Sequence, residues 1–120
     1  MEKLIQRYNN QIDKINTKFV RYLQNDVNWD ARLNAILGTR GVGKTTMIFQ
    51  HIKMTGQRNV SLVVFADDIY FSKNTLLDLA DNFYKNGGKY LYIDEVHKYQ
   101  NWSTEIKNIY DQIPDLNIVY

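Results

Sequence analysis

A stretch of eight residues, from Gly38 to Thr45, combines three glycines with a final lysine and threonine. It fits the Walker A pattern, in which a glycine and four free positions precede glycine, lysine and serine or threonine. Because Gly41 and Gly43 lack a Cβ atom, the loop can take positive φ angles and bring its backbone N–H groups close to phosphate oxygens. The stretch therefore predicts a phosphate-binding loop. The alternative is a chance glycine-rich turn between a strand and a helix.

The last two residues of the stretch add side-chain chemistry. Lys44 supplies a mobile cation for the β- and γ-phosphates of a nucleotide, and the Thr45 hydroxyl can bind Mg²⁺. The flanking segments support this, because 34–37 is typical of a short buried strand and 47–52 of a helix, whose N-terminus favours anions. The residues expected to bind the nucleotide are Gly38, Gly41, Val42, Gly43, Lys44, Thr45 and Thr46.

A second chemical feature is the pair of carboxylates Asp94 and Glu95, which follows the apolar run at 90–93 as in a Walker B motif. Ligands bind at the carboxyl edge of a parallel sheet, so Asp94 is expected to hold Mg²⁺ together with Thr45. Glu95 is expected to orient the water that attacks the γ-phosphate, while Lys44 stabilises the developing charge. Glu95 and Lys44 are therefore the catalytic candidates. The alternative is a pair of strand-end carboxylates in a surface turn.

The residues around this pair indicate which nucleotide binds. A GTPase is expected to have a glycine at the position of His97 and a separate Asn-Lys-x-Asp motif, and this chain has neither. ATP is therefore the expected nucleotide, and Glu95 favours hydrolysis. Two alternatives stay open: a nucleotide-operated switch or interaction module with little turnover, and a small-molecule kinase.

Apolar periodicity predicts strands that alternate with helices, which is typical of an α/β fold with a parallel sheet in three layers. An amphipathic helix over 2–24 precedes this core, and it either packs on the flank of the domain or docks a partner. Its apolar face is expected to carry Ile5, Tyr8, Ile12, Ile15, Phe19 and Tyr22. A capping pair, Thr75 and Asp78, is expected to open a helix that buries Leu76, Leu79, Ala80 and Phe83. The remaining expected elements are a helix at 102–112 and strands at 60–65, 90–93 and 117–120.

These elements divide the chain into an N-terminal helix and linker at 1–28 and a partial P-loop ATPase domain at 29–120. The last expected strand reaches the final residue, Tyr120, so we expect the chain to be part of a longer protein. A sheet edge cut in this way is a template for pairing with another chain, which predicts self-association.

Four further polar residues near the motifs have two interpretations each. His97 either senses the γ-phosphate or couples to a neighbouring subunit, or it packs or hydrogen-bonds in its loop, which is the preferred interpretation. Arg40 either touches the nucleotide or a neighbour, or it faces solvent. Asp67 and Asp68 follow an expected strand at the same edge of the sheet, where one of them can order the waters of a metal ion. A helix cap or a loop hydrogen bond is the preferred interpretation for both.

Composition excludes several classes of function. The chain has 120 residues, a net charge of +2 and no cysteine, which gives no argument for nucleic-acid binding and excludes disulfides and thiolate metal sites. The sequence contains no apolar run that resembles a signal peptide or a membrane span. A soluble, cytoplasmic protein without membrane partners is expected. The sequence does not indicate which protein or nucleic acid, if any, is its partner.

With these motifs, the region from about Leu33 to Tyr120 resembles an AAA-type ATPase of the additional-strand, catalytic-glutamate division of P-loop proteins. The resemblance rests on Gly38 to Thr45, on Tyr90 to Glu95, and on the less general string VHKYQNW at 96–102. Because of that string, the chain resembles most a bacterial and archaeal family whose members combine such a domain with a C-terminal winged-helix and nuclease-like region.

The resemblance implies a sheet in which the fourth strand lies between the strand before the Walker A loop and the Walker B strand. It also implies that a polar sensor on the fourth strand, an arginine finger, a fifth strand and a lid complete the site. These parts are expected to be missing from a chain that ends at Tyr120. Nucleotide binding is therefore implied for this chain, and its turnover by itself is expected to be inefficient.

Overall fold

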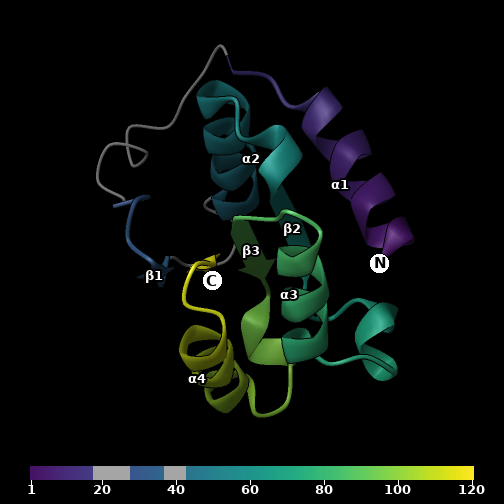
Figure 1. Ribbon diagram of the computed structural model, residues 1–120. Helices are drawn as coiled ribbons and strands as arrows, with labels where there is room; N and C mark the ends of the chain where they lie inside the picture. The colour runs from purple at the N-terminus through teal and green to yellow at the C-terminus, as the bar shows by residue number, and fades with distance from the viewer. Residues whose placement is uncertain (18–27, 37–42) are drawn as a thin grey trace.

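The computed structural model describes residues 1–17, 28–36 and 43–120, which form a parallel sheet flanked by helices (Figure 1). The strands are β1 (Leu33–Asn34), β2 (Ser61–Phe65), β3 (Tyr90–Asp94) and β4 (Asn117–Val119). The helices are α1 (Glu2–Lys14), α2 (Lys44–Thr55), α3 (Leu76–Lys85) and α4 (Trp102–Gln112). Short 3-10 turns lie at η2 (Arg58–Val60), η3 (Ile69–Ser72) and η4 (Val96–Lys98). The predicted α/β fold is confirmed.

The strands lie in the order β1-β4-β3-β2. Ile118 of β4 is opposite Leu33 of β1 on one side and opposite Leu91 of β3 on the other. The last strand in sequence thus lies between β1, which precedes the predicted Walker A loop, and β3, the predicted Walker B strand, as the resemblance implied. Since all pairs are parallel, the carboxyl ends of the strands meet at one edge of the sheet.

Helices cover both faces of this sheet. Figure 1 shows α1 and α2 on one side and α3 and α4 on the other, which is the predicted three-layer arrangement. Because both faces are covered, consecutive residues of β2 and β3 are buried and not only alternate ones. The buried strand residues are Leu62, Val63, Val64, Leu91, Tyr92 and Ile93.

The N-terminal helix is shorter than predicted. It ends at Lys14, because Ile15 takes an extended conformation with ψ 131°. The side chains of Gln50 and Lys53 on α2 donate hydrogen bonds to the carbonyl oxygens of Asn16 and Ile15, at 3.0 and 2.9 Å. These tertiary bonds satisfy carbonyl groups that a longer helix would have paired within itself.

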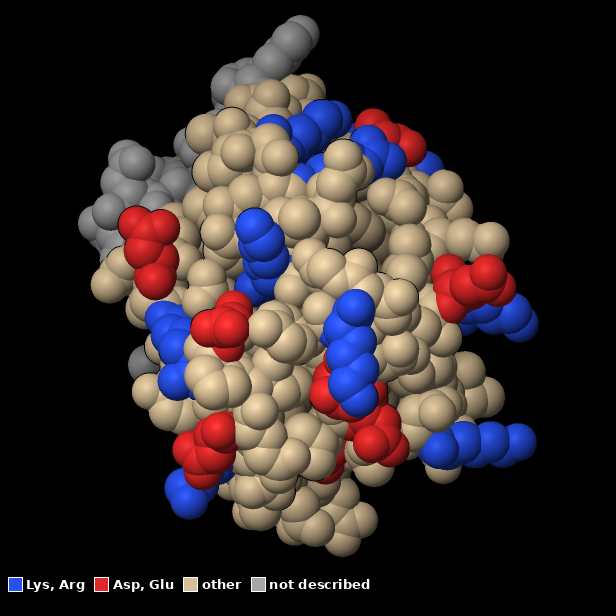
Figure 2. Space-filling model, viewed as in Figure 1, with Lys and Arg blue, Asp and Glu red and all other residues tan. Residues whose placement is uncertain are grey.

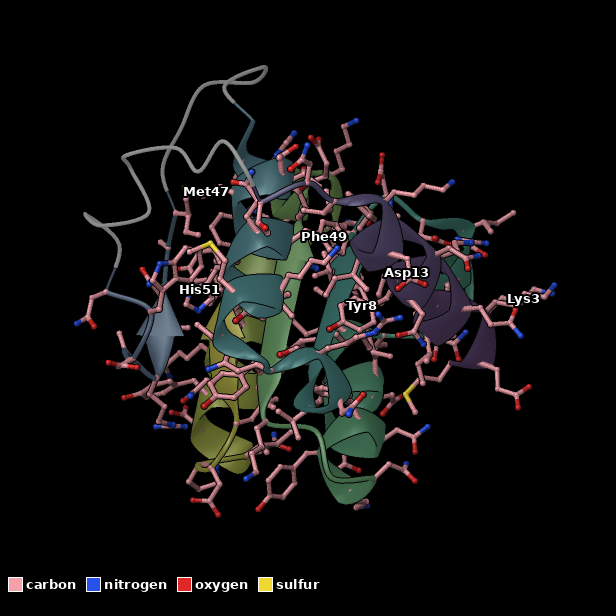
Figure 3. The ribbon with its side chains drawn as sticks, turned by 90° about the horizontal axis from the view of Figure 1, so that it is seen from above. Lys3, Tyr8, Asp13, Met47, Phe49 and His51 are labelled. Carbon is pink, nitrogen blue, oxygen red and sulfur yellow. The ribbon has the colours of Figure 1, made fainter. Side chains whose placement is uncertain are left out.

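The apolar face of α1 also differs in part from the prediction. Tyr8 and Ile12 are buried as expected, but Leu4 is buried in place of Ile5, which lies at the margin of the core. Tyr8 stacks on Phe49 of α2 with their ring centroids 6.1 Å apart (Figure 3). The helix therefore packs on the flank of the domain. The predicted contacts of Phe19 and Tyr22 lie outside the described residues.

The other helices follow their local signals. The Thr75 hydroxyl accepts a hydrogen bond from the Asp78 N–H at 3.0 Å and so caps α3, whose predicted apolar face is buried. Gly56 follows the last residue of α2 and has a φ of 69°, a value that glycine takes without strain. Helix α4 has the predicted bounds.

The strands begin and end within a few residues of the predicted positions. Strand β3 extends one residue further than predicted, to Asp94. Strand β1 covers Leu33–Asn34, whereas 34–37 was predicted, although the Ile36 N–H continues the pairing with a 2.7 Å hydrogen bond to the Tyr120 carbonyl. Leu37 lies outside the described residues.

Candidate functional site

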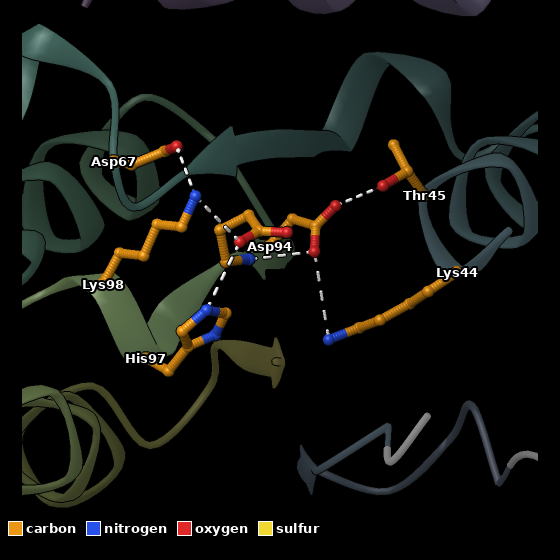
Figure 4. Close-up of polar contacts among 7 residues, drawn as sticks. Lys44, Thr45, Asp67, Asp94, His97 and Lys98 are labelled. Atoms are coloured by element: carbon orange, nitrogen blue, oxygen red, sulfur yellow. Dashed lines mark hydrogen bonds and ion pairs between the residues drawn. The ribbon is translucent and has the colours of Figure 1, made fainter. Parts of the chain in front are cut away.

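Asp94, the last residue of β3, is buried with 6% of its surface exposed. One carboxylate oxygen, Oδ2, accepts a hydrogen bond from the Thr45 hydroxyl (Figure 4). The other, Oδ1, accepts a 2.8 Å bond from the Glu95 N–H and lies 4.0 Å from the Lys44 Nζ. A buried carboxylate needs such partners, and here two of them are residues of the predicted Walker A motif.

The start of α2 brings these partners to Asp94. Gly43 precedes the helix with φ 78°, a left-handed conformation that favours glycine, and its carbonyl accepts the Met47 N–H at 2.9 Å. Lys44 and Thr45 then occupy the first turn, whose free N–H groups and dipole favour an anion. Thr46, in the same turn, is exposed.

The rest of the predicted loop lies outside the described residues, and with it Gly38, Arg40, Gly41 and Val42. The described part of the candidate site therefore consists of the end of the predicted Walker A motif and the predicted Walker B strand, which meet at the carboxyl edge of the sheet.

The donor set of Thr45 and Asp94 fits Mg²⁺. This ion prefers oxygen ligands and usually takes one or two from the protein, with water and phosphate oxygens filling the other positions. Within 1–17, 28–36 and 43–120, no group of three or more His, Cys, Asp or Glu side chains gathers as a metal site. A hydroxyl and one carboxylate are what a magnesium ion shared with a nucleotide requires.

Glu95 follows Asp94 but has a different set of partners. Its backbone is left-handed, with φ 55° and ψ 34°, a conformation that costs energy for a residue with a Cβ and is found at functional sites. Its Oε2 atom lies 3.4 Å from both His97 Nε2 and Lys98 Nζ. Two adjacent carboxylates are thus directed to separate groups.

The neighbouring polar residues take specific places. His97 is 66% exposed, and its Nε2 atom contacts Glu95 of the same loop, which agrees with the preferred interpretation of a hydrogen bond within the loop. Asp68 caps η3 by accepting the Tyr70 N–H at 2.9 Å, the helix-cap role preferred from the sequence. Asp67 contacts Lys98 Nζ at 3.4 Å.

Lys98 is the residue of this group that the sequence analysis did not single out. Its position three residues after Glu95 was the available signal, because side chains at that spacing meet in helical turns. The side chain lines a hollow of about 620 Å³ between the segments that follow β2 and β3. The lining includes Asp67, Ile69, Phe71, Lys98, Asn101 and Glu105.

Comparison with known families identifies the domain. A family model described as an AAA domain matches residues 30–120. The chain belongs to this AAA domain family. Membership supports a nucleotide-binding, ATPase-like function, and searches of curated proteins and of solved structures found no match.

Two further observations bear on partners of this AAA domain. In the described part of the chain, no helix has the length and apolar character needed to span a membrane. On the face shown in Figure 2, acidic and basic side chains are interspersed, in keeping with a net charge of only +2. The described residues of that face therefore form no broad basic surface of the kind that binds nucleic acid.

Proposed function

We propose that this AAA domain binds ATP with Mg²⁺ and hydrolyses the γ-phosphate by in-line attack of water. The observation that carries the proposal is the position of Asp94, hydrogen-bonded to Thr45 and 4.0 Å from the Lys44 Nζ. The contact joins the two Walker motifs at the edge of the sheet where nucleotides bind in this class of fold. The finer resemblance, to AAA proteins with a C-terminal winged-helix and nuclease-like region, is part of the same proposal and rests on the string at 96–102.

Each residue has a defined role in this mechanism. Lys44 and the N–H groups at the start of α2 would bind the β- and γ-phosphates, and Thr45 and Asp94 would hold the metal ion. When bound, Mg²⁺ would neutralise charge on the phosphate oxygens. Glu95 would orient the attacking water and accept its proton. The water oxygen forms a bond to the γ-phosphorus while the bond to the bridging oxygen breaks, and ADP leaves with that electron pair.

Glu95→Gln is the decisive variant for the proposed chemistry. It keeps a side chain of the same shape but removes the proton acceptor, so ATP affinity should stay and turnover should be lost. Glu2→Gln, on the exposed first turn of α1, is the matched control and should retain both. Equal loss of binding and turnover in Glu95→Gln would contradict the role of Glu95.

Binding of a fluorescent ATP analogue, with and without Mg²⁺, tests the site itself. Lys44→Ala should abolish Mg²⁺-dependent binding because it removes the cation expected to bind the β- and γ-phosphates. Lys53→Ala changes the same residue type in the last turn of α2, and should bind the analogue like the unchanged protein. If the two variants bind equally well, the analogue binds elsewhere.

A second candidate function is a nucleotide-operated switch, which the contacts of Glu95 with His97 and Lys98 favour. A carboxylate held by a neighbouring ammonium group is a poor partner for water, so hydrolysis would be slow. Turnover below about once per minute, compared with about 1 to 10³ per second for typical enzymes, together with ATP-dependent association with a partner, would favour the switch. Phosphate transfer to an added acceptor would indicate a kinase instead.

A further inference from the structure

Strand β2 has one side without a neighbouring strand. It is the outermost strand of the described sheet, and β3 is its partner on the other side. The Ala66 N–H, directly after β2, donates to the Asp94 carbonyl at 2.9 Å, in line with the pairing of Phe65 and Asp94. Because a strand turns the backbone groups of alternate residues to its two sides, the even-numbered residues of β2 face β3 and the odd-numbered ones face away.

Four backbone groups in a row on this outer side have no hydrogen-bond partner among the described residues. They are the Ser61 carbonyl, the N–H and carbonyl of Val63, and the Phe65 N–H. The row ends at the Phe65 carbonyl, which accepts the Asp68 N–H at 2.9 Å. Ser61 and Val63 are buried, with 5% and 3% of their surface exposed. Since buried backbone groups are almost always hydrogen-bonded, the outer side of β2 is an incomplete pairing edge.

A hollow of about 280 Å³ lies along this edge, between β2 and α1. We call it the β2 slot. It is lined by Leu4, Arg7 and Gln11 of α1, by 63–65 of β2, and by Asp67 and Asp68 after β2. The unpaired backbone groups of Val63 and Phe65 thus belong to residues that border an open space.

Helix α1 is held beside this edge at two points. Arg7 pairs with Asp68 just after β2, and Asp13 pairs at 2.5 Å with Arg58 just before it. Figure 1 shows the helix beside β2, which it contacts. The helix therefore forms a fixed wall of the β2 slot, while its described residues make no hydrogen bond to the unpaired groups of the strand.

We propose that the β2 slot binds one extended peptide segment of a partner protein, which joins the sheet as a further strand. This interaction surface goes beyond the nucleotide site and does not depend on ATP.

The first support is the order of the unpaired groups. Along the edge they alternate as acceptor, donor, acceptor and donor, and equivalent groups recur every two residues, about 6.6 Å apart. An extended peptide backbone has complementary groups at the same repeat, whereas a compact small molecule does not span it. Proteins that bind peptides by adding a strand to a free sheet edge use this pairing.

The second support is the width of the space. Neighbouring strands lie about 5 Å apart, so one extended segment fits between the edge and solvent beside α1. A second copy of this chain would bring its own sheet and covering helices against α1 at Leu4, Arg7 and Gln11. A single segment is therefore the occupant that this edge favours.

The third support is the character of the lining. Leu4 and Val63 are apolar and suit apolar side chains on one face of the segment. The charge of Arg7 is matched by Asp68, whereas the Asp67 side chain is 44% exposed and has one contact, at 3.4 Å, with Lys98. The carboxyl end of the β2 slot therefore favours a segment that ends in a basic residue.

The test uses a fluorescent probe peptide, Lys-Val-Thr-Val-Thr-Val-Lys with blocked ends, and measures its anisotropy on the unchanged protein without nucleotide. We expect saturable binding, about two- to fivefold weaker when glutamate replaces both lysines. Absence of saturation up to about 1 mM would overturn the proposal.

Two methylated versions of the probe test whether the backbone makes the contact. In an extended chain the valine N–H groups point to one side and the threonine N–H groups to the other. Methylation of one set should lower the affinity at least about tenfold, and methylation of the other should change it less than about twofold. Equal effects of the two sets would mean that no edge pairing occurs.

Two protein variants test the place of binding. Gln11→Trp fills the β2 slot with a large side chain and should lower the affinity at least about tenfold. Gln6→Trp is the matched control, because it changes the same residue type at an exposed position of α1 outside the slot lining, and it should bind the probe normally. Equal affinities in the two variants would place the probe elsewhere.

Amide hydrogen exchange identifies the contacted groups directly. The probe should slow exchange of the Val63 and Phe65 N–H groups at least about tenfold and leave those of Leu62 and Val64, which face β3, unchanged. Slow exchange of Val63 before the probe is added would show that its N–H is already paired, and would overturn the proposal. Probe affinity that falls as the protein concentration rises would show that a second copy occupies the edge instead.

Discussion

The hydroxyl of Thr45 donates a hydrogen bond to the carboxylate of Asp94, although 49 residues separate the two in the chain. Thr45 lies in the first turn of α2, and Asp94 ends β3. Strand β4 lies between β3 and β1, the strand that precedes α2 in the chain. A hydroxyl and a carboxylate in direct hydrogen-bond contact lie close enough together to share one magnesium ion.

Thr45→Ala should weaken the Mg²⁺-dependent part of ATP binding. The variant removes one expected ligand, and losses of about tenfold or more are typical when the support of a bound metal is disturbed. Titration calorimetry with ATP, in Mg²⁺ and in EDTA, measures the effect. Thr55→Ala is the matched control, because its hydroxyl donates to the His51 carbonyl at 2.8 Å at the opposite end of α2. An equal loss in Mg²⁺ and in EDTA would contradict the ligand role.

Arg32→Met should lower the free energy of unfolding by about 2 kcal/mol, the sum expected for a charged hydrogen bond and a cation–π contact. The Arg32 guanidinium lies 3.7 Å from the centroid of the Tyr110 ring and donates to the Tyr110 carbonyl, which joins the start of β1 to α4. Urea unfolding measures the change. Arg32→Lys keeps the charge but loses the planar fork, so it should recover only part of the stability. Full recovery with lysine would mean that charge alone matters.

His51 should make the protein less stable as the pH falls below neutrality. Burial lowers the pKa of His51, whose ring stacks on Trp29 with centroids 3.8 Å apart, and nearby Asp30 opposes the shift in part. Between the lowered folded-state pKa and the ordinary value of 6.5, the unfolded chain binds more protons. The stabilising contribution is therefore fully present above pH 6.5 and is lost as the pH falls through the folded-state pKa.

Urea midpoints between pH 7.5 and pH 5.5 should thus decline less in His51→Gln than in the unchanged protein. His97→Gln, at an exposed position, serves as the control and should retain the full decline. If the decline is the same in all three proteins, other groups cause the pH dependence.

The outer edge of β1 is expected to mediate the self-association predicted from the sequence. Helix α1 packs against β2, the outermost strand on the other side of the described sheet. The Asn34 carbonyl and the Ile36 N–H both bond to Tyr120, so the N–H of the exposed residue Ala35 points away from β4. Ala35→Pro removes that donor and should reduce the association without loosening β4.

Light scattering over a wide range of concentration measures this association. Ala35→Thr is the control, because it changes the side chain but keeps the N–H group, and it should associate like the unchanged protein. A constant monomer mass across the range would contradict the prediction.

Local signals predicted most of the regular elements correctly. The bounds of α4, the Thr75 cap of α3 and the glycine end of α2 each depend on residues within one or two turns, so the sequence is sufficient. The predicted end of α1 was wrong. The side chains of Gln50 and Lys53, far along the chain, donate hydrogen bonds to the carbonyl groups of Asn16 and Ile15, which a longer helix would have paired within itself. Bonds of this kind leave no periodic signal.

The sequence alone was enough to predict which groups form the candidate site, because the spacing of Lys44 and Thr45 in one motif and of Asp94 and Glu95 in the other is a local property. The order of the strands followed from the resemblance. Only the tertiary structure decided that Asp94 turns to Thr45 while Glu95 turns to Lys98. The different directions of these two carboxylates depend on the left-handed backbone of Glu95. Asp67, which follows β2, lies beside Lys98, which follows β3, because the two strands are neighbours in the sheet. Side-chain direction and long-range pairing are set by packing, which spacing along the chain does not encode.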